Sequence, residues 1–160
     1  MVRKYRIVHE PYLMEWLVKN FPPGTFRTNV RLGAVSPELV ERTVSPAERR
    51  ALKVFTAQAD AIVLLKDKVI IIEALVRPEW WKIQQLKQYK KLFKSTIEFK
   101  EHWDKPIELV LLTTISSPFH EKMCAEEGIR LILYRPKWIE EYLQTLAARK
   151  RRPPGAAMIG

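Results

Sequence analysis

A run of aliphatic, mostly β-branched residues places the strongest constraint on the fold of this chain. Val69 to Ile72 are all Val or Ile, and the apolar run continues past Glu73 to Val76. A segment of this kind is typical of a strand buried on both faces of a sheet. A second apolar run, 59–65, precedes it, and the polar segment 66–68 between them predicts a turn. The two runs therefore predict an antiparallel hairpin within a larger sheet.

The rest of the chain predicts an alternation of helices and strands. Helices are expected at 11–20, 78–94, 117–127 and 136–149, and strands at 26–32, 106–115 and 129–134, with a small extra helix starting at Ser45-Pro46. With the hairpin, the order is α, β, β, β, α, β, α, β, α, which predicts an α/β protein with a mixed central sheet flanked by helices. We expect one domain over 1–148 and a basic C-terminal tail over 149–160.

The charge balance indicates a polyanionic partner. The chain has 28 basic and 18 acidic residues, a net charge of +10, and an isoelectric point near 9.8. Nucleic acid is the first candidate; the alternative is a basic surface that serves solubility alone. Phosphate contacts are expected from Arg27, Arg31, Arg77, Lys87 and Arg151.

Several classes of protein are disfavoured by what the sequence lacks. No apolar run approaches the ~20 residues of a membrane span, and no signal peptide is evident. The single cysteine, Cys124, cannot form an internal disulfide. These features predict a cytoplasmic protein, or a virion-associated one if the source is viral. His9, His102 and His120 lack the spacing of zinc ligands.

Two acids in the predicted hairpin form a candidate metal site. Glu73 ends a highly apolar run, where an ionised carboxylate is costly unless it is paired or bound to metal. Asp60 opens the neighbouring strand, so an antiparallel hairpin should bring it beside Glu73. A divalent cation, Mg²⁺ or Mn²⁺, would relieve the repulsion between them, and a metal-bound water can attack a phosphodiester. Taken alone, each acid is better explained as a surface residue at a strand end.

The predicted helix 78–94 carries polar residues where a core helix would be apolar. Its apolar stripe holds Trp81, Ile83, Leu86, Leu92 and Phe93, and the opposite, solvent-facing side holds Gln84, Lys87, Gln88, Lys91 and Lys94. Lys82, Gln85 and Tyr89 fall in the middle of the apolar stripe and stack along one line. Snorkelling can explain the lysine, and tyrosine is common in cores. Gln85 has no such explanation, which favours a functional role for the line.

Taken together, these residues resemble the PD-(D/E)XK nuclease superfamily over roughly residues 10–135. Asp60 and Glu73 are similar to its two acids in kind and spacing, and Gln85-Leu86-Lys87-Gln88-Tyr89 resembles the Gln-x-x-x-Tyr motif of the RecB-like exonuclease branch. The resemblance implies a restriction-endonuclease-like core and a Mg²⁺-dependent deoxyribonuclease. Asp60 and Glu73 would hold the metal, while Gln85 and Tyr89 would order the site and contact DNA.

The chain departs from the family at position 75, where Leu75 replaces the expected lysine. Leucine can neither activate water nor offset charge in the transition state. Lys82 can supply the amine from the helix, as in some family members; Arg77 shares strand parity with Glu73 but is a poor proton acceptor. Otherwise the site is inactive, and the fold serves as a nucleic-acid-binding or structural subunit of a larger, for example viral, assembly. Glu15 is a further acid to consider beside the metal, although a solvated helix residue is the simpler interpretation. The sequence leaves open whether the protein forms a homo-oligomer.

Overall fold

One five-stranded mixed sheet forms the centre of the protein. The computed structural model describes residues 2–33 and 57–151, with side chains from residue 8. The strand order is β1-β2-β3-β4-β5, with β1 to β3 antiparallel and β3 to β5 parallel. The strands are β1 (Phe26–Leu32), β2 (Ala57–Leu64), β3 (Val69–Leu75), β4 (Ile107–Thr113) and β5 (Ile129–Leu133). The expected α/β class and mixed sheet are confirmed.

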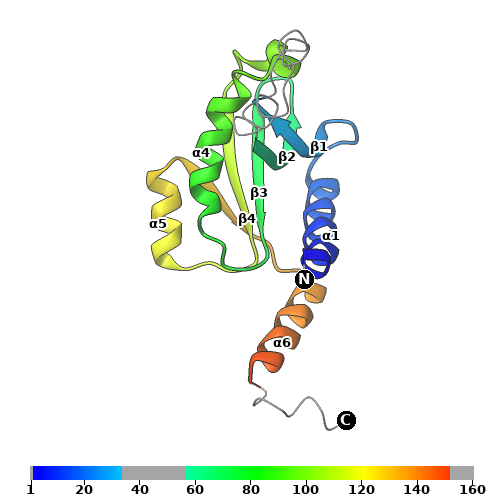
Figure 1. The fold of residues 1–160 in the computed structure, drawn as a ribbon. Coiled ribbons are helices and arrows are strands. Elements are labelled where there is room, and N and C mark those ends of the chain that lie inside the picture. The colour runs from blue at the N-terminus through cyan, green and yellow to red at the C-terminus, as the bar shows by residue number, and fades with distance from the viewer. Residues whose placement is uncertain (1, 34–56, 152–160) are drawn as a thin grey trace, which may run out of the picture.

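Helices cover both faces of this sheet. The described helices are α1 (Val2–Asn20), α4 (Lys82–Phe93), the short 3-10 helix η1 (Ile97–His102), α5 (Pro118–Glu126) and α6 (Lys137–Arg151). Helices α4 and α5 pack on one face, whereas α1 and the start of α6 pack on the other. The rest of α6 extends away from the sheet (Figure 1).

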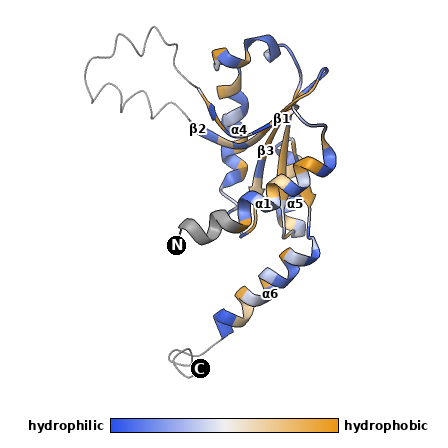
Figure 2. Ribbon diagram, turned by 90° about the vertical axis from the view of Figure 1, so that its right-hand side faces the viewer, coloured by the Kyte–Doolittle hydropathy of each residue, from blue (hydrophilic) through white to orange (hydrophobic). Residues whose placement is uncertain are grey.

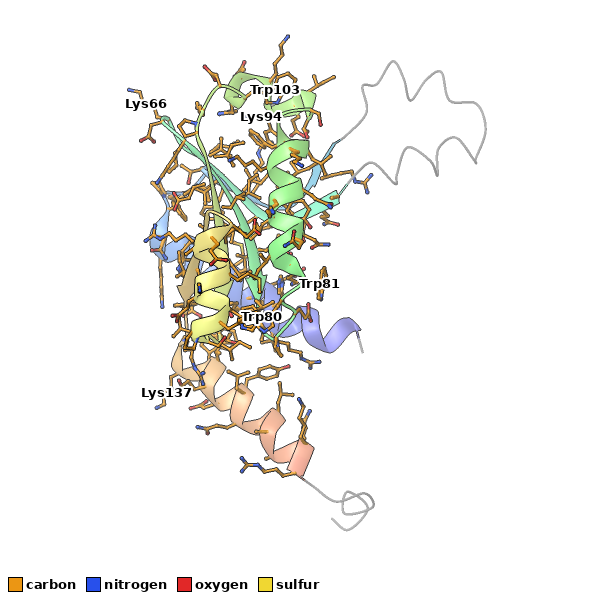
Figure 3. The ribbon with its side chains drawn as sticks, turned by 90° about the vertical axis from the view of Figure 1, so that its left-hand side faces the viewer. Lys66, Trp80, Trp81, Lys94, Trp103 and Lys137 are labelled. Atoms are coloured by element: carbon orange, nitrogen blue, oxygen red, sulfur yellow. The ribbon has the colours of Figure 1, made fainter. Side chains whose placement is uncertain are left out.

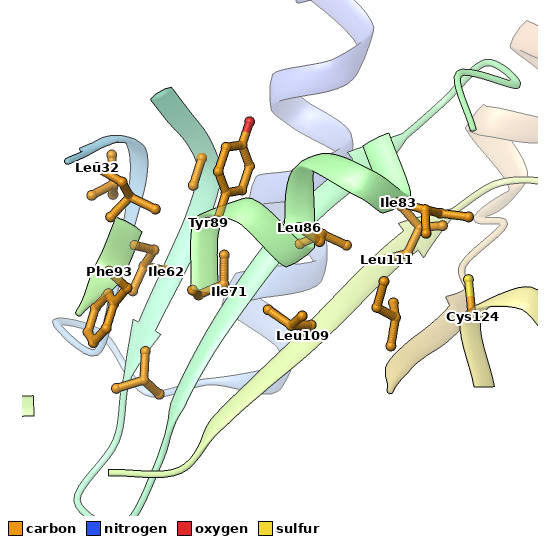
Figure 4. Close-up of a cluster of buried hydrophobic side chains, with 14 of the residues drawn as sticks. Leu32, Ile62, Ile71, Ile83, Leu86, Tyr89, Phe93, Leu109, Leu111 and Cys124 are labelled. Carbon is orange, nitrogen blue, oxygen red and sulfur yellow. The ribbon is translucent and has the colours of Figure 1, made fainter. Parts of the chain in front are cut away.

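Strand β3 is buried at every position because both of its faces are covered. Ile71 and Leu75 contribute to the cluster under α4, part of which Figure 4 shows. Ile70 and Ile72 contribute to the cluster under α1, and the hydrophobic colour accordingly follows β3 in Figure 2. Each aliphatic side chain buried in this way stabilises the fold by roughly 1.5–3 kcal/mol. This apolar strand holds Glu73 inside the protein, where its side chain is 2% exposed.

Helix α1 begins at Val2, so the expected start at Pro11 is wrong and the proline lies inside the helix. Proline in a helix interior removes one backbone hydrogen bond. Packing offsets this loss, because Tyr12 and Leu17 are fully buried after the proline. The turn before Pro11 is held by the buried His9, whose imidazole reaches β2 and β3.

The bounds of α4 and α6 also differ from those expected. α4 begins at Lys82 rather than at 78, and Trp81, expected in the apolar stripe, is 57% exposed. α6 continues to Arg151, so residues 149–151 of the expected tail are helical. Residues 152–160 and the expected small helix at Ser45-Pro46 lie outside the described residues.

Candidate active site

The two acids meet where β2 and β3 stop pairing as a regular ladder. The register extends to Ala61 opposite Ile72. Beyond it, the Asp60 backbone N–H donates to Glu73 Oε1 at 3.0 Å, and the Ala74 N–H donates to Asp60 Oδ2 at 2.9 Å. Each carboxylate thus accepts a hydrogen bond from a backbone N–H that would pair with the neighbouring strand in a regular ladder. Asp60 lies within β2 rather than opening it, because β2 starts earlier than expected, at Ala57.

Lys82 reaches the same place from the first turn of α4. Its side chain is buried, and its Nζ donates to the Ala74 carbonyl oxygen at 2.9 Å. The amine also lies 3.9 Å from Asp60 Oδ2 and 3.6 Å from Glu79 Oε2. Burial of an ammonium group is costly without such partners. The structure therefore fixes one cation beside the carboxylates of Asp60 and Glu79.

His9 is a member of this cluster that the sequence analysis missed. Its Nε2 lies 3.2 Å from Asp60 Oδ2 and 3.2 Å from the Ala74 carbonyl oxygen, and its side chain is buried. A usable signal exists in the sequence, since His9 precedes the buried Tyr12 and Leu13 by three and four positions. That spacing puts it on the inward side of α1. The signal was lost because the helix was expected to begin at Pro11.

Gln85 and Tyr89 continue the line of polar residues along α4. The Tyr89 hydroxyl lies 3.1 Å from Gln85 Oε1 and 3.1 Å from the Gln58 carbonyl oxygen, either of which can accept its proton. Tyr89 is buried and Gln85 half-buried. Figure 4 shows the Tyr89 hydroxyl directed away from the apolar side chains around the ring. Lys82, Gln85 and Tyr89 therefore form a line of polar side chains along α4 at the edge of the core.

Burial and the charges of the cluster shift the pKa values of Asp60 and Glu73 in opposite directions. Burial, followed by the negative charge of Asp60, raises the pKa of Glu73 well above its usual value. Burial also acts to raise the pKa of Asp60, but the hydrogen bond and charge of His9, together with the charge of Lys82, hold it below its usual value. Burial and then the charges of Glu73 and Asp60 raise the pKa of Tyr89. Glu73 thus keeps its proton to a higher pH than a free glutamate, while Asp60 carries the negative charge.

The oxygens of the cluster suit a hard divalent cation. Asp60 and Glu73 supply carboxylate oxygens and Ala74 a carbonyl oxygen, the ligand types that Mg²⁺ and Mn²⁺ prefer. Over residues 2–33 and 57–151, no group of three or more His, Cys, Asp and Glu is arranged to hold a metal. A cation here would complete its coordination with water, as Mg²⁺ usually does. The Lys82 amine would share the Asp60 and Ala74 oxygens with it.

Three other residues considered from the sequence have different surroundings. Leu75 is fully buried in the cluster under α4. Arg77 is exposed, with its guanidinium 3.5 Å from the Tyr142 hydroxyl of α6. Glu15 accepts from Lys19 at 2.9 Å and from the indole of Trp138 at 2.6 Å, so it joins α1 to α6.

The residues expected to contact phosphates lie on several elements. Arg27 pairs with Glu98 at 2.7 Å. Lys87 pairs with Glu127, and Arg31 and Arg151 are exposed on β1 and at the end of α6. No helix in the described part of the chain combines the length and apolar content of a membrane span.

Comparisons with known proteins add one remote likeness. No family model matches the chain, and no curated protein matches it. Among solved structures, the chain is similar to one described as "Structure of EndoMS-dsDNA2 complex", with a TM-score of 0.45 and 16% identity over 79% of this chain. The match covers 44% of that structure's chain, so the present chain spans less than half of its length.

Proposed function

We propose that the protein is a metal-dependent nuclease that hydrolyses phosphodiester bonds in DNA. The observation that carries this proposal is the convergence of Asp60, Glu73 and Lys82 at the point where β2 and β3 separate. Three elements contribute one ionisable group each to a buried location. A sequence selected only for stability would fill such a place with apolar side chains. Two acids that can hold a divalent cation, with an amine beside them, can support phosphodiester hydrolysis.

Each residue has a role that follows from its contacts. The carboxylates of Asp60 and Glu73, with the Ala74 carbonyl, would hold Mg²⁺ or Mn²⁺. When bound, the ion supplies a polarised phosphate and an activated water. Lys82 is already oriented by the Ala74 oxygen, so its ammonium would offset the negative charge that develops on the phosphate in the transition state. In this scheme Lys82 takes the role left open by Leu75.

Gln85 and Tyr89 act as positioning residues in this scheme. The Tyr89 hydroxyl joins α4 to the Gln58 carbonyl of β2 and to the side chain of Gln85. These contacts fix the distance between the helix that bears Lys82 and the strand that bears Asp60. The half-exposed amide of Gln85 is the group of this line that substrate could contact.

A second candidate function is favoured by Leu75 and Lys82 together. Leu75 is fully buried at the position where the resembled family has lysine. The Lys82 ammonium near Asp60 could serve as an internal cation in place of a metal. In that case the protein would bind nucleic acid, or act as a structural subunit, without cleaving it.

Cleavage of labelled DNA with Mg²⁺ or Mn²⁺ tests the proposal. Linear and circular DNA, single- and double-stranded, would be incubated with wild type, Glu73→Gln, Lys82→Met and the control Glu126→Gln, which changes an exposed acid of α5. We expect wild type and Glu126→Gln to cleave and the other two to lose activity at least 100-fold.

The other outcomes separate the two candidates. Cleavage lost in Glu73→Gln but kept in Lys82→Met would retain the nuclease and remove Lys82 from catalysis. If wild type cleaves none of these substrates but binds them without metal, the non-catalytic function is correct and the nuclease proposal is wrong.

A further inference from the structure

The side of α4 opposite the candidate active site carries a group of lysines around a hollow. Lys87, Lys90, Lys91 and Lys94 line a cavity of about 390 Å³ together with Ile107 and Leu109 of β4 and the turn at Glu127-Gly128. We call this feature the lysine hollow. Its floor is apolar and its rim is cationic. Among residues 2–33 and 57–151, Glu127 is the only acidic residue that lines it.

The arrangement of these lysines does not favour the helix. Residues three or four apart on a helix are neighbours, so Lys87 faces Lys90 and Lys91, while Lys94 faces the same two residues. All four pairs are repulsive. The dipole at the C-terminal end of α4 favours the cations of the last turn, Lys90 and Lys91, but it does not explain the gathering of all four around one hollow.

Most of this charge is not neutralised by acidic side chains of the described residues. Lys87 pairs with Glu127. In the part of the chain that the structure describes, Lys90, Lys91 and Lys94 form no ion pair with an acidic side chain. Their side chains are exposed, so their ammonium groups can reach a ligand without first breaking a contact.

We infer that the lysine hollow binds the phosphate backbone of nucleic acid. The row from Lys87 to Lys94 spans roughly 10 Å at 1.5 Å per residue, which is about three nucleotides at 3.4 Å each along one strand of a duplex. Closely spaced cations suit a row of phosphates, and three of these four form no ion pair within the described residues. The net charge of +10 acts in the same direction.

The hollow is separate from the candidate active site because it lies on the other side of α4 from Lys82. Bound nucleic acid would therefore contact the protein at two places. The inference shares with the proposed function only the class of ligand. Binding at the hollow needs neither metal nor cleavage.

The test compares two double variants that change the net charge equally. Lys91→Glu/Lys94→Glu alters the hollow, and Lys66→Glu/Lys137→Glu alters two exposed lysines elsewhere on the molecule (Figure 3). Binding of a fluorescent DNA duplex is measured by anisotropy in EDTA from 50 to 200 mM salt. We expect the hollow variant to lose at least 10-fold in affinity at 50 mM salt and the control to lose less than 3-fold. The slope of log K against log salt should become less steep by about 2 for the hollow variant, at about 0.9 per phosphate contact.

Two further variants complete the test. One controls for loss of folding, and the other should raise the affinity for DNA instead of lowering it. Lys91→Gln/Lys94→Gln removes charge while keeping good helix formers, and should weaken binding in the same way but less, with an unchanged circular dichroism spectrum. Glu127→Gln removes the acid that faces Lys87 and should tighten binding about 2-fold.

Equal losses in the two double variants would overturn the inference, because binding would then depend on net charge alone. Failure of wild type to bind DNA at 50 mM salt would overturn it as well. If wild type binds through the hollow but never cleaves, the nuclease proposal is wrong while this inference stands. If wild type cleaves DNA and the hollow variant binds DNA as tightly as the control variant does, the inference about the hollow is wrong while the nuclease proposal stands.

Discussion

Helix α4 holds two kinds of lysine, and their surroundings differ completely. Lys82 is 5% exposed, donates to one carbonyl oxygen and lies near two carboxylates. Lys91 is exposed at the lysine hollow. The first has one position fixed by the protein, whereas the second keeps the freedom of a flexible, hydrated cation. The comparison teaches that residue type alone does not separate a cation fixed in the core from a mobile cation at the surface.

The largest expected difference between the two lysines is in catalysis. Lys82→Met should lower the single-turnover cleavage rate at saturating DNA and metal at least 100-fold, since a preorganised cation at the reacting phosphate is lost. Lys91→Met should instead raise the DNA concentration needed for half-maximal rate. Lys66→Met is the control and should match wild type. An equal fall in the saturated rate for Lys82→Met and Lys91→Met would break the distinction.

The next effect concerns stability. Lys82→Met should lower the free energy of unfolding by about 1–3 kcal/mol at pH 7 in EDTA, because Asp60 and the Ala74 carbonyl lose a buried donor. Lys91→Met should change it by less than about 0.5 kcal/mol, as is usual at exposed sites. Urea denaturation measures both values. A Lys82→Met variant that proves more stable than wild type would show that the buried amine is retained at the expense of stability.

The carboxylates that Lys82 accompanies give a pH-dependent prediction. Burial raises the folded-state pKa of Glu73, so the folded state binds more protons than the unfolded state above the usual glutamate pKa of about 4.3. The resulting stabilisation is complete below that pH and is lost as pH rises through the raised pKa. Glu73→Gln replaces the carboxyl with an amide that does not ionise, so this loss of stability with rising pH disappears. In EDTA the variant should therefore melt several degrees above wild type at pH 8, at about 2–4 °C per kcal/mol, and near wild type at pH 4.5.

Melting curves from pH 4.5 to 8.5 provide the measurement. Glu126→Gln serves as the control at an exposed acid and should follow wild type throughout. A Glu73→Gln variant whose melting temperature runs parallel to that of wild type over this range would contradict the raised pKa.

The smallest effect compares the two tryptophans before α4. Trp80 stacks on His120 of α5 with ring centroids 3.5 Å apart and planes 8° from parallel, so Trp80→Ala should cost about 1 kcal/mol. Trp81 is mostly exposed, and Trp81→Ala should cost less than about 0.5 kcal/mol. Urea unfolding of both variants checks the order. A larger loss for Trp81→Ala would mean that its indole is held by contacts stronger than its exposure indicates.

Much of the fold could be predicted because the strands of the sheet are strongly patterned. Val69 to Ile72 indicated a strand covered on both faces, and β3 is buried throughout. The closeness of Asp60 and Glu73 followed from the hairpin, since pairing along two neighbouring strands is set locally. Neither required knowledge of the helices.

The remaining errors come from tertiary contacts that a local pattern does not contain. His9 meets Asp60 and Ala74 across 51 and 65 residues of sequence, and only the docking of α1 brings them together. Trp81 was placed in the core because helical periodicity gives the direction of a side chain but not where the covered surface ends. η1 was not predicted, and it has non-helical backbone angles at Phe99.

The contacts between α1 and residues 134–138 have a consequence for the order of folding. Tyr12 donates to the Tyr134 carbonyl at 2.9 Å, and Trp138 donates to Glu15, across 122 and 123 residues of sequence. Helix α1 is synthesised before these partners, which follow it by more than a hundred residues. Closing so long a loop is slow. The contacts of α1 with residues 134–138 should therefore form late, after the partners of His9 in β2 and β3 have been synthesised.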